Sequence, residues 1–178
     1  MNHIAKENLN SNDDKKNNIV LIGMPGVGKS TIGVILAKEL GYQFLDADLL
    51  IQKQEKRLLK EIIAQEGVDG FIQIENQVNA AIEAEDTVIA TGGSVIYGKE
   101  AMEHLKEIAV VVYLRLSYEV LETRLGNLKN RGVVLREGQT LKALYNERIV
   151  LYEKYADIIV DEENKGIEAT LENIIEIL

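Results

Sequence analysis

The chain has 178 residues, of which 46% are hydrophobic and 28% charged, and this suits one globular domain with a sizeable core. It has no cysteine, which excludes disulfides, thiolate zinc sites and cysteine nucleophiles. A net charge of −9 disfavours general binding to nucleic acids or acidic membranes, and no apolar run approaches the roughly 18 residues that would span a bilayer. We therefore expect a cytoplasmic monomer with neither nucleic acid nor a membrane as its partner.

The first part of the chain changes from a polar tail to apolar, regularly spaced segments. Residues 1–17 are rich in asparagine and charge and lack the apolar segment of a secretory signal, so we expect a disordered tail before a single domain at 18–178. The wholly apolar run 19–22 predicts a buried strand. Helical spacing of apolar residues predicts a helix over 30–40 that stops at Gly41. A short strand at 43–45 and helical segments in two pieces, ending at Gly67, are expected next.

In the middle of the chain, predicted helices again alternate with predicted strands. A helix is expected over 71–84, because Phe71 and three later apolar residues share one helical face. Strands are expected at 87–90 and at 109–114, the most apolar segment. Ser117 is expected to cap the helix that follows and ends near Gly126.

The last third of the chain begins with a polar segment and continues with segments whose pattern predicts helices and a strand. Residues 127–139 show no clear period, and we interpret them as a mobile loop. A helix over 140–155, a strand at 158–160 and a closing helix over 166–178 complete the chain. Because apolar strands alternate with helices, the sequence predicts an α/β fold of three layers, with helices on both faces of a parallel sheet.

One motif between the first strand and the first helix carries most of the functional information. Residues 23–30 read GMPGVGKS, in which Gly23, Gly28, Lys29 and Ser30 complete a phosphate-binding loop of the Walker A type. Its glycines let backbone N–H groups point at phosphate oxygens, and the helix adds its positive N-terminus. We expect ATP as ligand, with Lys29 on the outer phosphates and Ser30 on Mg²⁺. The expected nucleotide-binding residues are Gly26, Val27, Gly28, Lys29, Ser30 and Thr31.

Two further polar groups follow strands. Asp46 and Asp48 come after the second strand, where one could hold Mg²⁺ through water and the other orient or deprotonate a substrate hydroxyl. The alternative for Asp46 is a simple helix cap. Gly92 and Gly93 end another strand and either permit close approach of a ligand or form a plain tight turn.

Three arginines are candidates for anion contacts. Arg131 and Arg136 lie in the expected mobile loop, from which a guanidinium could reach a transferring phosphoryl group, although most loop arginines are only solvated. Arg148 could pair with a substrate carboxylate, or form a surface pair with Tyr152 or nearby glutamates.

Together these segments resemble the shikimate kinase family, within the nucleoside-monophosphate-kinase-like group of phosphate-loop enzymes, over roughly residues 18–160. The resemblance rests on GMPGVGKSTIG (23–33), FLDAD (44–48), FIQIE (71–75), ATGGSV (90–95), VVYL (111–114) and RIVLYEKYAD (148–157). It implies a five-stranded parallel sheet, a mobile lid, and transfer of the γ-phosphoryl of ATP to the 3-hydroxyl of shikimate. By matched position it implies Asp46 on Mg²⁺, Asp48 on the substrate hydroxyl, Gly92 and Gly93 in the substrate pocket, Arg131 on the phosphates, Arg148 on the carboxylate and Arg124 near adenine.

The chain departs from the family pattern at several positions, including one that is expected to contact the substrate. Ile72, followed by Gln73, stands where the family has an arginine that contacts shikimate. Ser94 replaces a third glycine, the lid motif differs at 131–135, and Pro25 is the chain's single proline. Loss of the arginine predicts shikimate binding weaker by about one to two decades or more.

Three functions remain open from the sequence. The first is a shikimate kinase-like phosphotransferase. The second is a kinase of the same fold for another small hydroxyl metabolite, which Ile72 favours. The third is a nucleotide-binding regulatory protein without catalytic activity.

Overall fold

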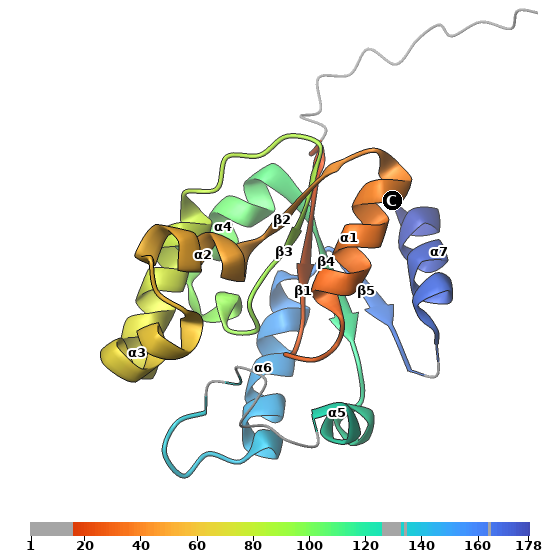
Figure 1. Cartoon of the computed structure of the whole chain (residues 1–178). Coiled ribbons are helices and arrows are strands. Elements are labelled where there is room, and N and C mark those ends of the chain that lie inside the picture. The colour runs from red at the N-terminus through yellow and green to blue at the C-terminus, as the bar shows by residue number, and fades with distance from the viewer. Residues whose placement is uncertain (1–15, 126–132, 134, 164) are drawn as a thin grey trace, which may run out of the picture.

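The computed structural model describes residues 16–125, 133, 135–163 and 165–178 (Figure 1). The strands are β1 (Asn18–Ile22), β2 (Gln43–Asp46), β3 (Thr87–Ala90), β4 (Ala109–Arg115) and β5 (Ile158–Asp161). The helices are α1 (Lys29–Leu40), α2 (Ala47–Glu55), α3 (Leu59–Ala80), α4 (Lys99–Ile108), α5 (Tyr118–Leu125), α6 (Leu141–Tyr155) and α7 (Ile167–Ile177), with a 3₁₀ turn, η1 (Val95–Tyr97). Residues 1–15 of the tail expected over 1–17, and residues 127–132 and 134 of the mobile loop expected over 127–139, lie outside the described residues.

The strands form one sheet in the order β2-β3-β1-β4-β5, and all neighbouring pairs are parallel. α1 and α7 pack on one side of it, whereas α4 and α6 pack on the other, with α3 against α4 (Figure 1). The predicted three-layer α/β fold is therefore confirmed. Because the strands are parallel, the loops after β1, β2 and β3 meet at one edge of the sheet.

The three central strands β3, β1 and β4 are largely buried and mostly apolar, as expected where both faces of a sheet are covered. In β1, Val20, Leu21 and Ile22 are completely buried, as are Val111 and Val112 in β4. α1 ends at Gly41, which has a left-handed φ of 72°, and Tyr42 N–H donates to the Ala37 carbonyl at 2.8 Å. The predicted stop at this glycine is thus confirmed.

Several boundaries differ from the sequence predictions. The helix expected over 71–84 ends earlier, at Ala80. Within α3 the helix is interrupted at Gly67, whose φ of 72° and ψ of −178° are not helical. The predicted end of a helical piece at Gly67 is therefore confirmed. α4 was not among the predicted helices, although its residues are helical in pattern.

Ser117 was predicted to cap the helix after β4. Its carbonyl does accept the Leu121 N–H at 3.0 Å, but its buried hydroxyl makes no hydrogen bond with any described residue. The prediction of a side-chain cap was wrong. Within the described ranges, no helix is both long and apolar enough to cross a membrane.

Candidate active site

The loop between β1 and α1 wraps around the N-terminus of α1, as the phosphate-loop motif predicts. Gly23 has a φ of 146°, and a Cβ there would lie 2.7 Å from the Leu114 carbonyl oxygen, so a side chain is excluded. Gly28 has a φ of 106° and precedes the first turn of α1, where its carbonyl accepts the Ile32 N–H at 2.9 Å. This backbone forms a concave cradle at a helix N-terminus, which fits an anion.

The Lys29 side chain lies inside the cradle. Its Nζ donates to the carbonyls of Gly23 at 2.8 Å and Met24 at 3.0 Å, and the side chain is buried. Burial lowers the pKa of Lys29 to about 8, although the nearby Asp48 carboxylate opposes the change. The ammonium group is held at the floor of the loop, where phosphate oxygens would compensate its desolvation.

Asp46 links the phosphate loop to β2. Its Oδ2 accepts the Ser30 hydroxyl at 2.8 Å, while Oδ1 accepts the backbone N–H groups of Asp48 at 3.0 Å and Leu49 at 3.2 Å. The helix-cap alternative is thus confirmed, and the same carboxylate also contacts the expected metal-binding hydroxyl. A hydroxyl and a carboxylate joined at the mouth of a phosphate loop are hard oxygen ligands, and they fit Mg²⁺.

A second acidic group, Glu75, lies beside Asp48 although it is on a different element. Glu75 comes from α3 and is 1% exposed; its Oε2 accepts the Ser94 hydroxyl at 2.5 Å, whereas Oε1 has no partner among the described residues. Burial raises the pKa of Glu75 to about 7 and also raises the pKa of Asp48. Gly92 lies against both carboxylates, and a Cβ there would collide with Glu75 and lie 2.9 Å from Asp48 Oδ1.

Arg148 is buried rather than on the surface, so the surface-pair alternative was wrong. It is 2% exposed, and its Nε donates to the Tyr97 hydroxyl at 3.4 Å with the guanidinium carbon 5.4 Å from the ring centre. A Cβ on Gly93 would lie 3.1 Å from Arg148 Nη1. The Tyr152 hydroxyl donates to the Gly93 carbonyl at 2.5 Å and fixes this turn next to the arginine. The glycine pair therefore brings the backbone against a buried cation, and a plain tight turn does not describe it.

Two connected cavities open at this edge of the sheet. One of about 570 Å³ runs from Gly28, Lys29 and Ser30 to Asp48 and Gly92. A small pocket of about 30 Å³ continues from it between Phe71, Glu75, Ser94 and Arg148. Both cavities are lined by Pro25, Asp48, Leu59, Gly92 and Gly93. A phosphate-binding half thus lies directly beside a polar pocket with two carboxyl groups and one arginine.

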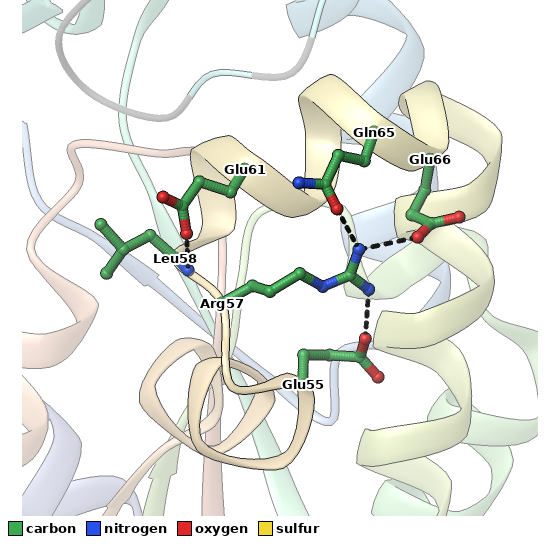
Figure 2. Close-up of polar contacts among 6 residues, drawn as sticks. All are labelled: Glu55, Arg57, Leu58, Glu61, Gln65 and Glu66. Carbon is green, nitrogen blue, oxygen red and sulfur yellow. Dashed lines mark hydrogen bonds and ion pairs between the residues drawn. The ribbon is translucent and has the colours of Figure 1, made fainter.

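The α2–α3 corner holds Leu59 over these cavities, and Arg57 fixes the corner (Figure 2). Its guanidinium donates to Glu55 at 2.5 Å, Gln65 at 2.6 Å and Glu66 at 2.8 Å, which joins the end of α2 to the turn before Gly67. Figure 2 also shows Glu61 accepting the Leu58 N–H, at 2.8 Å, at the start of α3. The sequence pattern did not single out this network.

The remaining predicted site residues lie in three places. Arg124 lines a third cavity beside Val27 and Thr31. Arg131 lies outside the described residues, so its lid role stays a prediction. Arg136 forms an exposed ion pair with Asp69 at 2.7 Å.

Sequence reasoning missed Glu75, Ser94 and Tyr97 as site residues. Glu75 carried part of the family resemblance through FIQIE, and that was the available signal. Ser94 was noted only as a departure. Ile72, by contrast, is half-buried and is not among the residues that line these cavities.

Comparisons with known proteins agree with this geometry. The family model described as shikimate kinase matches residues 25–178. A shikimate kinase of Thermodesulfovibrio yellowstonii is 38% identical over 161 residues, which cover 89% of this chain and 92% of the relative. One of Bacillus cytotoxicus is 35% identical over 158 residues, 88% and 95% of the two chains.

Solved structures give the same result. A shikimate kinase from Acinetobacter baumannii in complex with shikimate has a TM-score of 0.79 and 33% identity, covering 90% of this chain and 91% of its own. The enzyme from Aquifex aeolicus has a TM-score of 0.75 and 32% identity, covering 89% and 94%. A sugar kinase from Janibacter, at 19% identity and a TM-score of 0.57, shares only the fold. This protein belongs to the shikimate kinase family and is a small-molecule kinase.

Proposed function

We propose that this protein transfers the γ-phosphoryl group of ATP to the 3-hydroxyl of shikimate. The observation that carries the proposal is the buried Arg148, which lies beside Asp48 and Glu75 in a pocket that opens onto the phosphate loop. A cation for a carboxylate, acidic groups for hydroxyls and a phosphate cradle match a polyhydroxy acid as the acceptor. The A. baumannii neighbour, described in complex with shikimate, supports this acceptor.

In the proposed reaction, the acceptor oxygen attacks the γ-phosphorus as the bond to the bridging oxygen of ADP breaks. Lys29 leaves its loop carbonyls for the phosphate oxygens and stabilises their charge. Asp48 accepts a hydrogen bond from the attacking hydroxyl and takes its proton or passes it to solvent. Arg148 fixes the carboxylate, so that the hydroxyl is held in line.

Magnesium and the lid complete the proposed site. Ser30 and Asp46 would hold Mg²⁺, directly or through water, and the ion would neutralise charge on the ATP phosphates. Arg131, from the expected lid, would contact the same phosphates. Gly26, Val27, Gly28 and Thr31 would surround the nucleotide, and Arg124 would lie near its base.

The test is release of ADP from Mg-ATP over a wide range of shikimate concentrations, with the product identified by phosphorus NMR. We expect shikimate to stimulate ADP release strongly and Lys29→Met to abolish the stimulation. Lys38→Met is the matched control, because Lys38 lies exposed on the same helix and should retain activity. Full activity of Lys29→Met would contradict the role of Lys29, and absence of stimulation by shikimate would contradict the acceptor.

A second candidate is a kinase of the same fold for another small hydroxyl compound. Ile72 motivates it from the sequence, and in the structure Ser94 favours it, because the Ser94 hydroxyl donates to Glu75 inside the acceptor pocket, where the family pattern has a glycine. A screen of hydroxylated metabolites for ATP consumption separates the two candidates. Turnover confined to shikimate would exclude the second.

A further inference from the structure

Tyr97 lies between the glycine turn after β3 and the start of α4. It is the last residue of η1, and its N–H donates to the Ser94 carbonyl at 3.0 Å, so its backbone is fixed relative to the turn. α6 packs beside η1 and brings two consecutive residues, Glu147 and Arg148, to the tyrosine. Consecutive residues of a helix point in different directions. Glu147 is accordingly exposed, whereas Arg148 is buried.

The Tyr97 hydroxyl connects these two charged side chains. It donates to Glu147 Oε1 and accepts from Arg148 Nε at 3.4 Å. Because a hydroxyl has one proton, the bond to Glu147 leaves its lone pairs for the arginine. The bond to Nε is long, but the guanidinium carbon also lies 5.4 Å from the centre of the Tyr97 ring, within the range of a cation–π contact. The hydroxyl and the ring therefore constrain the guanidinium together.

The direction of this hydroxyl is fixed from the other side. Glu147 Oε2 accepts from Gln139 Nε2 at 3.1 Å, and Gln139 Oε1 accepts the Arg136 N–H at 3.2 Å. Burial raises the pKa of Tyr97, and the hydrogen bond to Glu147 raises it further, so the hydroxyl keeps its proton. The residues just before α6 thus hold the carboxylate that orients Tyr97.

Arg148 has no acidic partner in the part of the chain that the structure describes. It forms no ion pair there, and Glu147, its neighbour in sequence, reaches it only through the Tyr97 hydroxyl. Its Nη1 lies 3.1 Å from the position of a Cβ on Gly93, a residue that lines both cavities. With Nε bound to Tyr97, the terminal nitrogens remain as donors, and a buried cation without a counter-ion suits an anionic group on a ligand.

We propose that Tyr97 is a positioning residue for Arg148, which it holds through Nε and keeps apart from Glu147, so that the terminal nitrogens are available to the acceptor carboxylate. This inference rests on the proposed function in one respect, namely that Arg148 binds a carboxylate of the acceptor. A phenylalanine at this position would keep the ring but release Nε. The guanidinium could then turn toward Glu147, and its charge would be shared with a carboxylate of the protein.

The first test compares shikimate with its methyl ester, which lacks the negative charge, at saturating Mg-ATP. We expect Tyr97→Phe to lower kcat/KM for shikimate about three- to tenfold, mainly through KM, which is the effect of one hydrogen bond. Its kcat/KM for the ester should equal that of wild type, because the ester has no charge for Arg148 to bind.

Two further variants complete this test. Glu147→Ala should act in the same direction as Tyr97→Phe, since the hydroxyl loses the partner that orients it. The double variant should show less than the sum of the two effects, because both residues act on Arg148 through one hydroxyl. Tyr155→Phe is the control, as it removes a hydroxyl from another half-buried tyrosine of α6, and it should behave as wild type.

The second test needs no acceptor. In the proton–nitrogen NMR spectrum of the ligand-free protein, the Nε–H of Arg148 is assigned by its absence in Arg148→Lys. We expect this signal to shift and to exchange faster with solvent in Tyr97→Phe than in wild type, because its hydrogen bond is lost. Tyr155→Phe should leave the signal unchanged.

Two outcomes would overturn the inference. One is an equal effect of Tyr97→Phe on shikimate and on the ester, which is what a merely structural role would produce, and the other is an Arg148 Nε–H signal that does not respond to the substitution. If shikimate fails to stimulate wild type while the signal depends on Tyr97, the proposed acceptor is wrong and the positioning of Arg148 stands.

Discussion

At the scale of single residues, the active-site region combines buried ionisable groups whose burial is not fully compensated within the described chain. Lys29 has only carbonyl partners, and Glu75 has one oxygen without a partner. Such groups reduce the stability of the folded state, and ligands that pair with them recover part of that loss. Their shifted pKa values therefore predict how ATP affinity and folding stability change with pH.

The lowered pKa of Lys29 predicts that ATP affinity depends on pH. With a pKa of about 8, the ammonium form of the ligand-free protein decreases about tenfold between pH 7 and pH 9, and ATP affinity should fall by about the same factor. Calorimetric titrations across this range provide the measurement. Lys29→Met should bind ATP weakly at every pH, and a flat wild-type profile would contradict a lowered pKa for a Lys29 that contacts the phosphates.

The raised pKa of Glu75 predicts that the stability of the folded protein decreases as the pH rises. The unfolded chain loses this proton near its ordinary value of 4.5 and the folded protein near 7, so the folded state binds the extra proton between them. The stability contributed by the neutral carboxyl is complete below pH 4.5 and lost as pH rises through 7, a difference of roughly 3 kcal/mol.

Glu75→Gln should remove this dependence, because the amide stays neutral and can still accept from Ser94. Urea unfolding at pH 5 and pH 8 should show the variant gaining stability relative to wild type at the higher pH. Glu83→Gln, at an exposed position, serves as the control. An equal difference between variant and wild type at both pH values would mean that Glu75 titrates normally.

At the scale of elements, the break in α3 determines the position of the α3 residues that line the acceptor pocket. Gly67 separates the first turns, which carry Leu59 over the cavities, from the segment that carries Phe71 and Glu75. Arg57 joins Glu66, just before the break, to the end of α2 (Figure 2). The pocket thus depends on a change of direction within one helical segment.

Gly67→Ala tests the conformation of this break. A φ of 72° with a ψ of −178° is accessible almost only to glycine, and no atom lies within 4 Å of the position of an added Cβ. The cost should therefore come from the backbone alone and reduce the free energy of unfolding by about 1–3 kcal/mol. Gly166→Ala is the control, because its φ of −78° suits alanine and its added Cβ also meets nothing. Equal effects of the two substitutions would show that Gly67 does not hold this conformation in solution.

At the scale of the whole molecule, a net charge of −9 surrounds a site for anionic ligands. Capture of those anions therefore depends on the few cations that the fold gathers, mainly Lys29 and Arg148, together with the N-terminus of α1. Lys29 begins α1 directly after the central strand β1, and Arg148 lies in α6, which packs on β4, so ligand binding is coupled to the stability of the whole domain.

Mg-ATP should accordingly stabilise the whole domain. At one hundred times its dissociation constant, a ligand adds about 2.7 kcal/mol, which for a domain of this size raises the unfolding midpoint by about 5–10 °C. Differential scanning calorimetry with and without Mg-ATP measures this shift. Lys29→Met should lose most of the shift, whereas Lys38→Met should retain it. A shift in Lys29→Met as large as in wild type would place the nucleotide away from the phosphate loop.

The sequence by itself determined the sheet, the phosphate loop and the main nucleotide and acceptor candidates. These features are local: apolar runs, glycine spacing and the residues that follow each strand depend on neighbours within a few positions. In contrast, Arg148 was ambiguous in sequence, because helical spacing does not show whether a charged side chain is inside a pocket or on the surface. Its burial against Tyr97 follows from the packing of α6 beside η1.

Only the tertiary structure decided which distant residues share the site. Glu75 meets Ser94 from 19 positions away, and Glu162 follows β5 but lines a cavity with Thr31 of α1. The partners of a buried carboxyl group lie on other elements, and a single sequence does not specify those distances. The sequence therefore determined which chemical groups are present and how the backbone carries them, and folding decided which of them are desolvated together and so act on a ligand.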